Sequence, residues 1–121
     1  MAPLFMKGKV MKFTNPYWSY KLRIEVLQRW ILIHSILYYE MNESIVSDKE
    51  FDDHAKQLVE MQNNYPDSAK ASQYWNAFHD FDGTTGFDLP HRLSDTDKQH
   101  LFKIAHHVLN VYKGGQRSER R

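Results

Sequence analysis

Cysteine is absent from this chain of 121 residues. A chain without cysteine cannot form a disulfide framework, an iron–sulfur cluster or a thiolate zinc site. Long apolar runs are absent as well: residues 30–39, WILIHSILYY, are interrupted by His34 and Ser35 and are too short to span a bilayer. The first residues lack the sustained apolar core of a signal peptide. We therefore expect a cytoplasmic protein that does not contact a membrane.

The apolar residues recur at helical spacing, which predicts an all-α fold. Pro16, which follows an asparagine suited to capping, is typical of a helix start, and we expect a first helix of about 25 residues from there. A second helix is predicted after Ser47, because Ser47 and Glu50 have the spacing of a capping box. A short helix over 68–78 and a last helix over 95–113 complete the prediction. The result is a small bundle of three main helices plus a short one.

A chain of this length fits one compact domain. We expect a flexible N-terminal arm over 1–14, a helical domain over 15–113 and a basic, disordered tail over 114–121. The tail is predicted to begin where Gly114 or Gly115 ends the last helix. The apolar face of the first helix is predicted to include Leu22, Val26, His34 and Tyr38. The predicted core consists of Leu27, Trp30, Ile31, Leu37, Phe51, Leu58, Leu101, Ile104 and Val108.

The stretch Asp80-Phe81-Asp82-Gly83-Thr84 resembles the DxDGT motif of haloacid-dehalogenase-type phosphatases. In that family the motif follows a buried parallel strand, and further βα units complete the site. Here a predicted helix precedes the motif and a single helix follows it, so we interpret the match as accidental and predict no catalytic residue. The expected structure is a polar turn in which Asp80 and Asp82 accept bonds from nearby amides, and Gly83 and Gly86 adopt positive φ.

The histidines of the last helix are the candidates for metal ligands. His100 and His107 are seven residues apart and His106 adjoins the second of them. A helical metal site needs ligands three or four residues apart, or a carboxylate from another element. We therefore predict no metal site, and we expect His34 to be a hydrogen-bonded core residue.

Charge is segregated along the chain. Residues 1–39 carry a net charge of +5, residues 40–97 of −9 and residues 98–121 of +5. Because the acidic centre would repel nucleic acid, we do not expect a nucleic-acid partner. The acidic block favours a protein partner with a basic surface, and Asp53 and Glu60, seven residues apart on one helix, are the predicted contact residues.

One stretch, residues 37–67, resembles the N-terminal nicotinamide-mononucleotide-binding domain (domain Ia) of NAD-dependent bacterial DNA ligases. The resemblance rests on two adjacent tyrosines, a ten-residue step from Tyr38 to Asp48, a Glu-Phe-Asp sequence at the start of a helix, and the turn NNYPD after that helix. Phe51 departs from the family, which usually has tyrosine there. The residues in step with the family's binding segment are Tyr38, Tyr39, Asp48, Phe51 and Asp52.

The resemblance implies that Tyr38 and Tyr39 face a nicotinamide ring, and that Asp48 and Asp52 contact the ribose, the carboxamide or the cationic ring. NMN or NAD is thus a possible ligand, although no cofactor is required. The Lys-x-Asp-Gly motif of the ligase nucleophile does not occur in the chain, so we expect no enzymatic activity.

Two functions follow from these observations. The first is a non-catalytic interaction protein of a phage or mobile element, which binds and inhibits a host protein in the host cytoplasm. The alternative is a protein that binds a nicotinamide nucleotide, alone or as a subunit of a split NAD-dependent enzyme.

Overall fold

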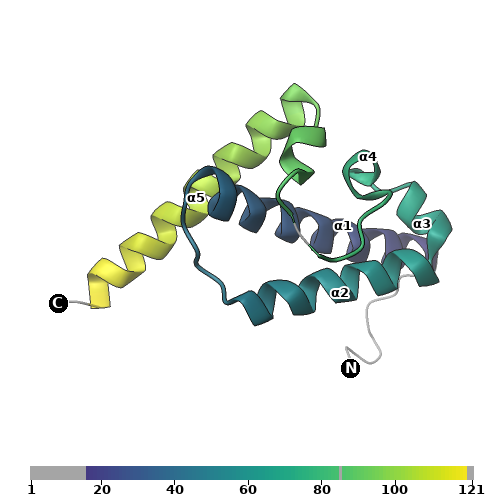
Figure 1. Ribbon diagram of the computed structural model, residues 1–121, viewed down its shortest axis with the longest axis horizontal. Coiled ribbons are helices and arrows are strands. Elements are labelled where there is room, and N and C mark those ends of the chain that lie inside the picture. The colour runs from purple at the N-terminus through teal and green to yellow at the C-terminus, as the bar shows by residue number, and fades with distance from the viewer. Residues whose placement is uncertain (1–15, 85, 120–121) are drawn as a thin grey trace.

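The computed structural model describes residues 16–84 and 86–119, and these residues form helices and connecting turns without a strand (Figure 1). The all-α prediction is confirmed. The predicted N-terminal arm, residues 1–14, and the asparagine cap before Pro16 lie outside the described residues. In order the elements are α1 Pro16–Ser35, the π-helix η1 Ile36–Glu40, α2 Asp48–Asn64, α3 Pro66–Lys70, α4 Trp75–Phe78, the 3-10 helix η2 Leu89–Arg92 and α5 Asp95–Glu119.

Helix α1 is the centre of the fold and packs against α2, α3 and α5 (Figure 1). Its buried stripe runs at helical spacing through Ile24, Gln28 and Ser35 and includes leucine and isoleucine neighbours at each turn. The predicted apolar face is wrong at Leu22 and Val26, whose side chains are 43% and 64% exposed. The prediction placed only apolar residues on the buried face. Gln28 and Ser35 are polar and yet buried, so the apolar pattern indicated the wrong face at these turns.

The π-helix η1 continues α1 directly and changes which side chains face the core. Ile36 and Leu37 remain buried, but Tyr38 and Tyr39 are exposed, so the predicted burial of Tyr38 is wrong. A π-turn takes more residues per turn than an α-helix, so it rotates the side chains that follow. The π-helix ends at Glu40, with Met41 as its cap. Asn42 follows with a φ of 58°, a conformation that asparagine tolerates better than most residues.

Helix α2 begins as the capping box predicts, because the amide of Glu50 donates to Ser47 Oγ at 3.0 Å. It buries Ala55 and Leu58 against α1. Among the predicted core residues five are buried: Leu27, Ile31, Leu37, Leu58 and Leu101. The other four pack partly buried against the core: Trp30, Phe51, Ile104 and Val108.

The predicted single helix over 68–78 is wrong, since α3 and α4 are separate short helices. The break follows Lys70, where the side chain of Ser72 donates to the carbonyl of Ala69. Gln28 Nε2 donates to Ser72 Oγ at 2.9 Å and to Gln62 Oε1 at 3.1 Å. This buried polar network connects α1, α2 and the α3–α4 turn.

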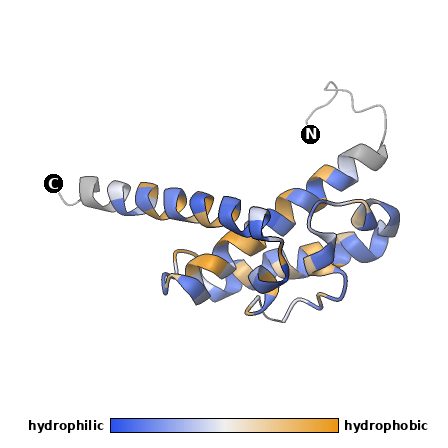
Figure 2. Cartoon of the chain, turned by 90° about the horizontal axis from the view of Figure 1, so that it is seen from above, coloured by the Kyte–Doolittle hydropathy of each residue, from blue (hydrophilic) through white to orange (hydrophobic). Residues whose placement is uncertain are grey.

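Helix α5 packs against α1 and η1, and its C-terminal part extends beyond the other helices (Figure 2). The predicted helix end at Gly114 or Gly115 is wrong, because α5 continues to Glu119. Neither glycine has a neighbouring side chain within 4 Å of the position of a Cβ. Glycine weakens a helix by about 1 kcal/mol without forbidding it, so the helical backbone includes most of the predicted tail.

Candidate functional site

A cavity of about 310 Å³ lies between η1 and the first turn of α2. Its walls are the two tyrosines of η1, the segment 43–47, the start of α2 and Thr84 from the loop before η2. The π-turn exposes the tyrosines on one side, and the capping box fixes the start of α2 on the other. All five residues predicted from the ligase resemblance line this one cavity: Tyr38, Tyr39, Asp48, Phe51 and Asp52.

Aromatic rings form one wall of the cavity. The rings of Tyr38 and Tyr39 meet edge to face, with centroids 4.8 Å apart. Tyr39 also meets Phe87 edge to face, with centroids 5.4 Å apart. Phe51 lies opposite, with its ring centroid 6.0 Å from that of Trp30. Phe87 is not among the residues that line the cavity, and it lies next to Tyr39 because the fold brings the two together.

The carboxylates of the cavity differ in their ion pairs. Glu43 pairs with Lys113 of α5, with Nζ and Oε2 3.1 Å apart. Asp48 and Asp52 are exposed at the start of α2 and form no ion pair among the described residues. The dipole of α2 favours a carboxylate in its first turn, where Asp48 lies.

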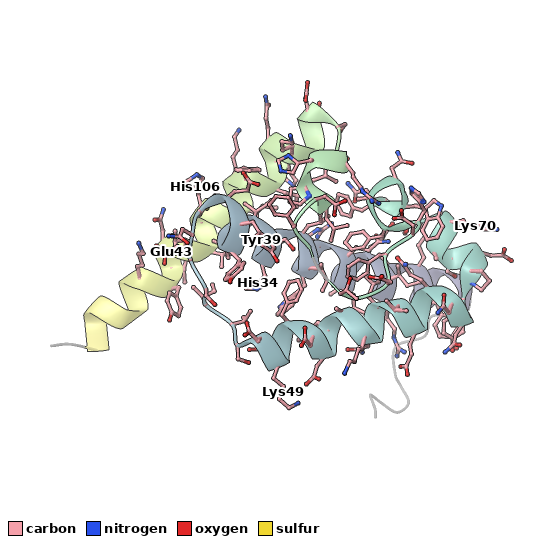
Figure 3. All side chains as sticks on the ribbon, viewed as in Figure 1. His34, Tyr39, Glu43, Lys49, Lys70 and His106 are labelled. Atoms are coloured by element: carbon pink, nitrogen blue, oxygen red, sulfur yellow. The ribbon has the colours of Figure 1, made fainter. Side chains whose placement is uncertain are left out.

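The two predicted partner-binding residues, Asp53 and Glu60, are exposed on α2 but do not line the cavity. Asp53 pairs with Lys49 at 2.7 Å, and this bond lowers the pKa of the Asp53 carboxyl. Lys49 lies on the outer side of α2 and points away from the cavity (Figure 3). The outer side of α2 therefore carries the positive charge of Lys49 and the negative charge of Asp53 together.

His34 lines the inner part of the cavity and is half-buried (Figure 3). Its ring is 4.3 Å from that of Trp30, and Trp30 stacks on His54 at 3.8 Å. Burial lowers the pKa of His34, although the negative charge of Glu50 opposes the effect. Burial thus favours the neutral form of the His34 imidazole. The expected hydrogen-bonded core histidine is instead a cavity-lining residue.

Ser35 is the second polar residue on the inner side of the cavity. Its side chain is fully buried, and its hydroxyl has no hydrogen-bond partner among the described residues. Gly86 packs directly against it: a Cβ added to Gly86 would overlap Ser35 Oγ and lie 3.4 Å from Phe51 Cζ. The contact needs a residue without a side chain at position 86.

The loop that carries the DxDGT match contributes Thr84 to the cavity. Arg92 holds it: Nη1 donates to Asp80 Oδ1 at 2.5 Å, and Nη2 donates to Asp88 Oδ2 at 3.2 Å. Asp82 Oδ1 accepts from the amide and the hydroxyl of Thr84, which lines the cavity. The predicted polar turn is thus confirmed at Asp82, whereas Asp80 pairs with an arginine instead of an amide.

Gly83 has the predicted positive φ, 88°, whereas the φ of Gly86 depends on residue 85, which lies outside the described residues. Gly86 is needed for its close contact with Ser35. The residues before the motif form the short helix α4 rather than a strand. Arg92 lowers the pKa of Asp80, and the bonds from Thr84 lower that of Asp82. The carboxylates of Asp80 and Asp82 thus form bonds that hold the loop in its conformation. This role agrees with the interpretation of the motif as accidental.

Among the described residues no group of three His, Asp or Glu side chains is arranged to hold a metal ion. His100, His106 and His107 are exposed on α5. No helix in the described part of the chain is long and apolar enough to cross a membrane.

Comparison with known proteins identifies a family match over the part of the chain that supplies most of the cavity lining. Residues 18–72 match a family described as DNA ligase-like, N-terminal NAD+-binding domain. The match covers slightly less than half of the chain and contains the predicted segment 37–67, so the resemblance is confirmed. No curated protein and no solved structure matches the chain at a significant level.

Proposed function

We propose that this chain, which contains a DNA ligase Ia-like domain over residues 18–72, binds the nicotinamide mononucleotide half of NAD+ in the cavity between η1 and α2. The observation that carries the proposal is the convergence of the ligase-like residues. Tyr38 and Tyr39 come from η1, whereas Asp48, Phe51 and Asp52 come from α2, and all five line one cavity.

The size of the cavity supports a mononucleotide. Pockets for small molecules range from about 300 to 1,000 Å³, and a cavity of about 310 Å³ is at the lower end of that range. It suits one half of a dinucleotide better than the whole. The AMP half of NAD+ then extends into solvent or to another protein.

The chemistry of the walls supports a cationic ring. Aromatic faces and carboxylates both attract a delocalised cation, and the oxidised nicotinamide ring carries a positive charge. Tyr38, Tyr39 and Phe51 supply the aromatic surface, and Asp48 and Asp52 supply carboxylates without a competing ion pair among the described residues. Phe51 has no hydroxyl to donate, so its contribution is limited to packing against the ligand.

We propose a binding function without catalysis by this chain. The matched family domain is the NAD+-binding one, and the sequence has no Lys-x-Asp-Gly motif to accept AMP. The chain acts either as a free nucleotide-binding protein or as one subunit of a split NAD-dependent enzyme. Either role would require the protein to be located where nicotinamide nucleotides are present, and we propose the cytoplasm.

The other expected function, inhibition of a host protein by a phage-type protein, stays a prediction. Its predicted contact residues, Asp53 and Glu60, are exposed. The ion pair between Asp53 and Lys49 reduces the negative charge of that surface. The cavity therefore gives nucleotide binding the stronger support.

Calorimetry with NMN tests the proposal through a matched pair of variants on α2. Asp48→Ala removes a carboxylate that lines the cavity, and Asp53→Ala removes one that does not. Loss of a bond to a charged group should weaken NMN binding by about 10- to 100-fold in Asp48→Ala, and Asp53→Ala should bind NMN like the unchanged protein. Equal affinities of the two variants, or no binding by the unchanged protein, would contradict the proposal.

A further inference from the structure

The lining of the cavity does not match one charge of the proposed ligand. NMN has a phosphate group in addition to its cationic ring, and at pH 7 a phosphate ester carries a charge of about −1.5 to −2. The lining contains the carboxylates of Glu43, Asp48 and Asp52, and no lysine or arginine is among the described residues that line the cavity. These carboxylates repel a phosphate inside the cavity. The phosphate should therefore lie at an edge of the cavity where a cation is within reach.

The start of α2 is not a favourable edge, although a helix N-terminus can bind a phosphate through its free amides. The amide of Glu50 already donates to Ser47 Oγ. The first turn of α2 also contains the carboxylates of Asp48 and Glu50, so the helix dipole already acts on two anions. A phosphate at this end would meet both of them.

A cation lies at the edge of the cavity that Glu43 forms. Lys113 Nζ of α5 is 3.1 Å from Glu43 Oε2, and Figure 3 shows Glu43 next to α5. Among the described residues, Lys113 is the one cation that forms an ion pair with a lining residue. Its side chain is about half exposed, and an ammonium group has three N–H donors. Lys113 can therefore donate to a phosphate while it keeps its bond to Glu43.

Two further polar residues lie on the same face of α5 as Lys113. Asn110 precedes Lys113 by three residues and His106 precedes it by seven, and these spacings place the three side chains on one side of the helix. All three side chains are exposed. An ammonium, an amide and an imidazole each provide N–H donors for phosphate oxygens. This face of α5 thus offers a row of donors that extends from the edge of the cavity.

We propose that Lys113 and the adjoining face of α5 bind the phosphate of the nicotinamide nucleotide. The inference rests on the proposed function. It adds a specificity-determining residue from α5, which lies outside the ligase-like match over residues 18–72. In NAD+ the same phosphate is joined to AMP, so the AMP half leaves the cavity on the side of α5.

The test is calorimetry of the full chain with NMN and with nicotinamide riboside, which differs from NMN only by the missing phosphate. The unchanged protein should bind NMN on the order of 5-fold more tightly at low salt, as expected for an exposed ion pair. Added salt should reduce this ratio.

Lys113→Met keeps an unbranched side chain and removes the charge. The ratio of the two affinities should fall to one or below, because the carboxylates of the cavity then repel the phosphate without compensation. The affinity for nicotinamide riboside should not fall. Lys49→Met is the matched control, because Lys49 points away from the cavity (Figure 3), and it should keep the ratio of the unchanged protein.

Three results would overturn the inference, and they can be told apart. If the unchanged protein binds NMN and nicotinamide riboside equally, the phosphate site is wrong and the proposed function stands. If Lys113→Met lowers both affinities together and keeps their ratio, Lys113 has only a structural role. If neither ligand binds the unchanged protein, the proposed function itself fails, and this inference fails with it.

Discussion

Gly86 packs against Ser35 so closely that a methyl group at position 86 would overlap the serine hydroxyl. This contact joins the loop before η2 to the end of α1, where Ser35 lines the cavity, and the same loop contributes Thr84 to the lining. The loop lies outside the ligase-like match, which ends at residue 72. The cavity is therefore built from the family segment and from a segment that the family match does not include.

Gly86→Ala should destabilise the protein by about 1–3 kcal/mol, because the added methyl group overpacks a filled site. Ser35→Ala should be nearly neutral, since the serine hydroxyl forms no hydrogen bond with the described residues. The double variant should be more stable than Gly86→Ala alone, because it lacks the atom nearest to the new methyl group. Urea unfolding measures all three. Strictly additive free energies would show that the two residues do not interact.

Gln62→Leu should lower the free energy of unfolding by about 1–3 kcal/mol. The substitution removes the acceptor for Gln28 Nε2 and the donor to the buried carbonyl of Phe78. Gln57→Leu, on the exposed side of the same helix, is the control and should change it by less than about 0.5 kcal/mol. If both variants unfold at the same urea concentration, the buried network contributes nothing to stability.

His34 should make stability depend on pH. Burial holds the pKa of His34 below its value in the unfolded chain, which is about 6.5. As pH falls through that value, the unfolded chain takes up a proton that the folded protein refuses, so the free energy of unfolding should decrease. Stability measured between pH 7.5 and about pH 5.5 should therefore fall less steeply in His34→Gln than in the unchanged protein. An identical slope would mean that His34 titrates alike in both states.

The chain should form no covalent adduct with AMP when it is incubated with NAD+ and magnesium. The motif that provides the ligase nucleophile is absent from the sequence. Intact-mass spectrometry measures the result directly, and a mass increase equal to one AMP group would show that the chain catalyses the first ligase step.

Local patterns predicted much of the fold and site. The capping box at Ser47 fixed the start of α2, and the ten-residue step from Tyr38 to Asp48 identified residues that share one cavity. These features depend on a few neighbouring residues, so a single sequence contains them. The resemblance to the ligase domain then supplied the chemistry.

Other features depend on tertiary contacts that the sequence does not mark. The stripe of α1 was misplaced because Gln28 and Ser35 are polar core residues. The π-turn that exposes Tyr38 leaves no local pattern. Phe87 meets Tyr39 and Gly86 meets Ser35 in a loop whose ends Arg92 holds through Asp80 and Asp88. Arginine, aspartate and glycine at these positions are equally typical of a solvated loop.

The most direct measurement of the central claim is the affinity of the full chain for NMN compared with AMP, by calorimetry at low salt. The two ligands share the ribose and the phosphate, so their difference isolates the base. Our account predicts that NMN binds and that AMP binds at least about 10-fold more weakly, because only the nicotinamide ring carries a charge for Asp48, Asp52 and the aromatic wall. Equal affinities, or tighter binding of AMP, would contradict the claim that this cavity recognises the nicotinamide half of NAD+.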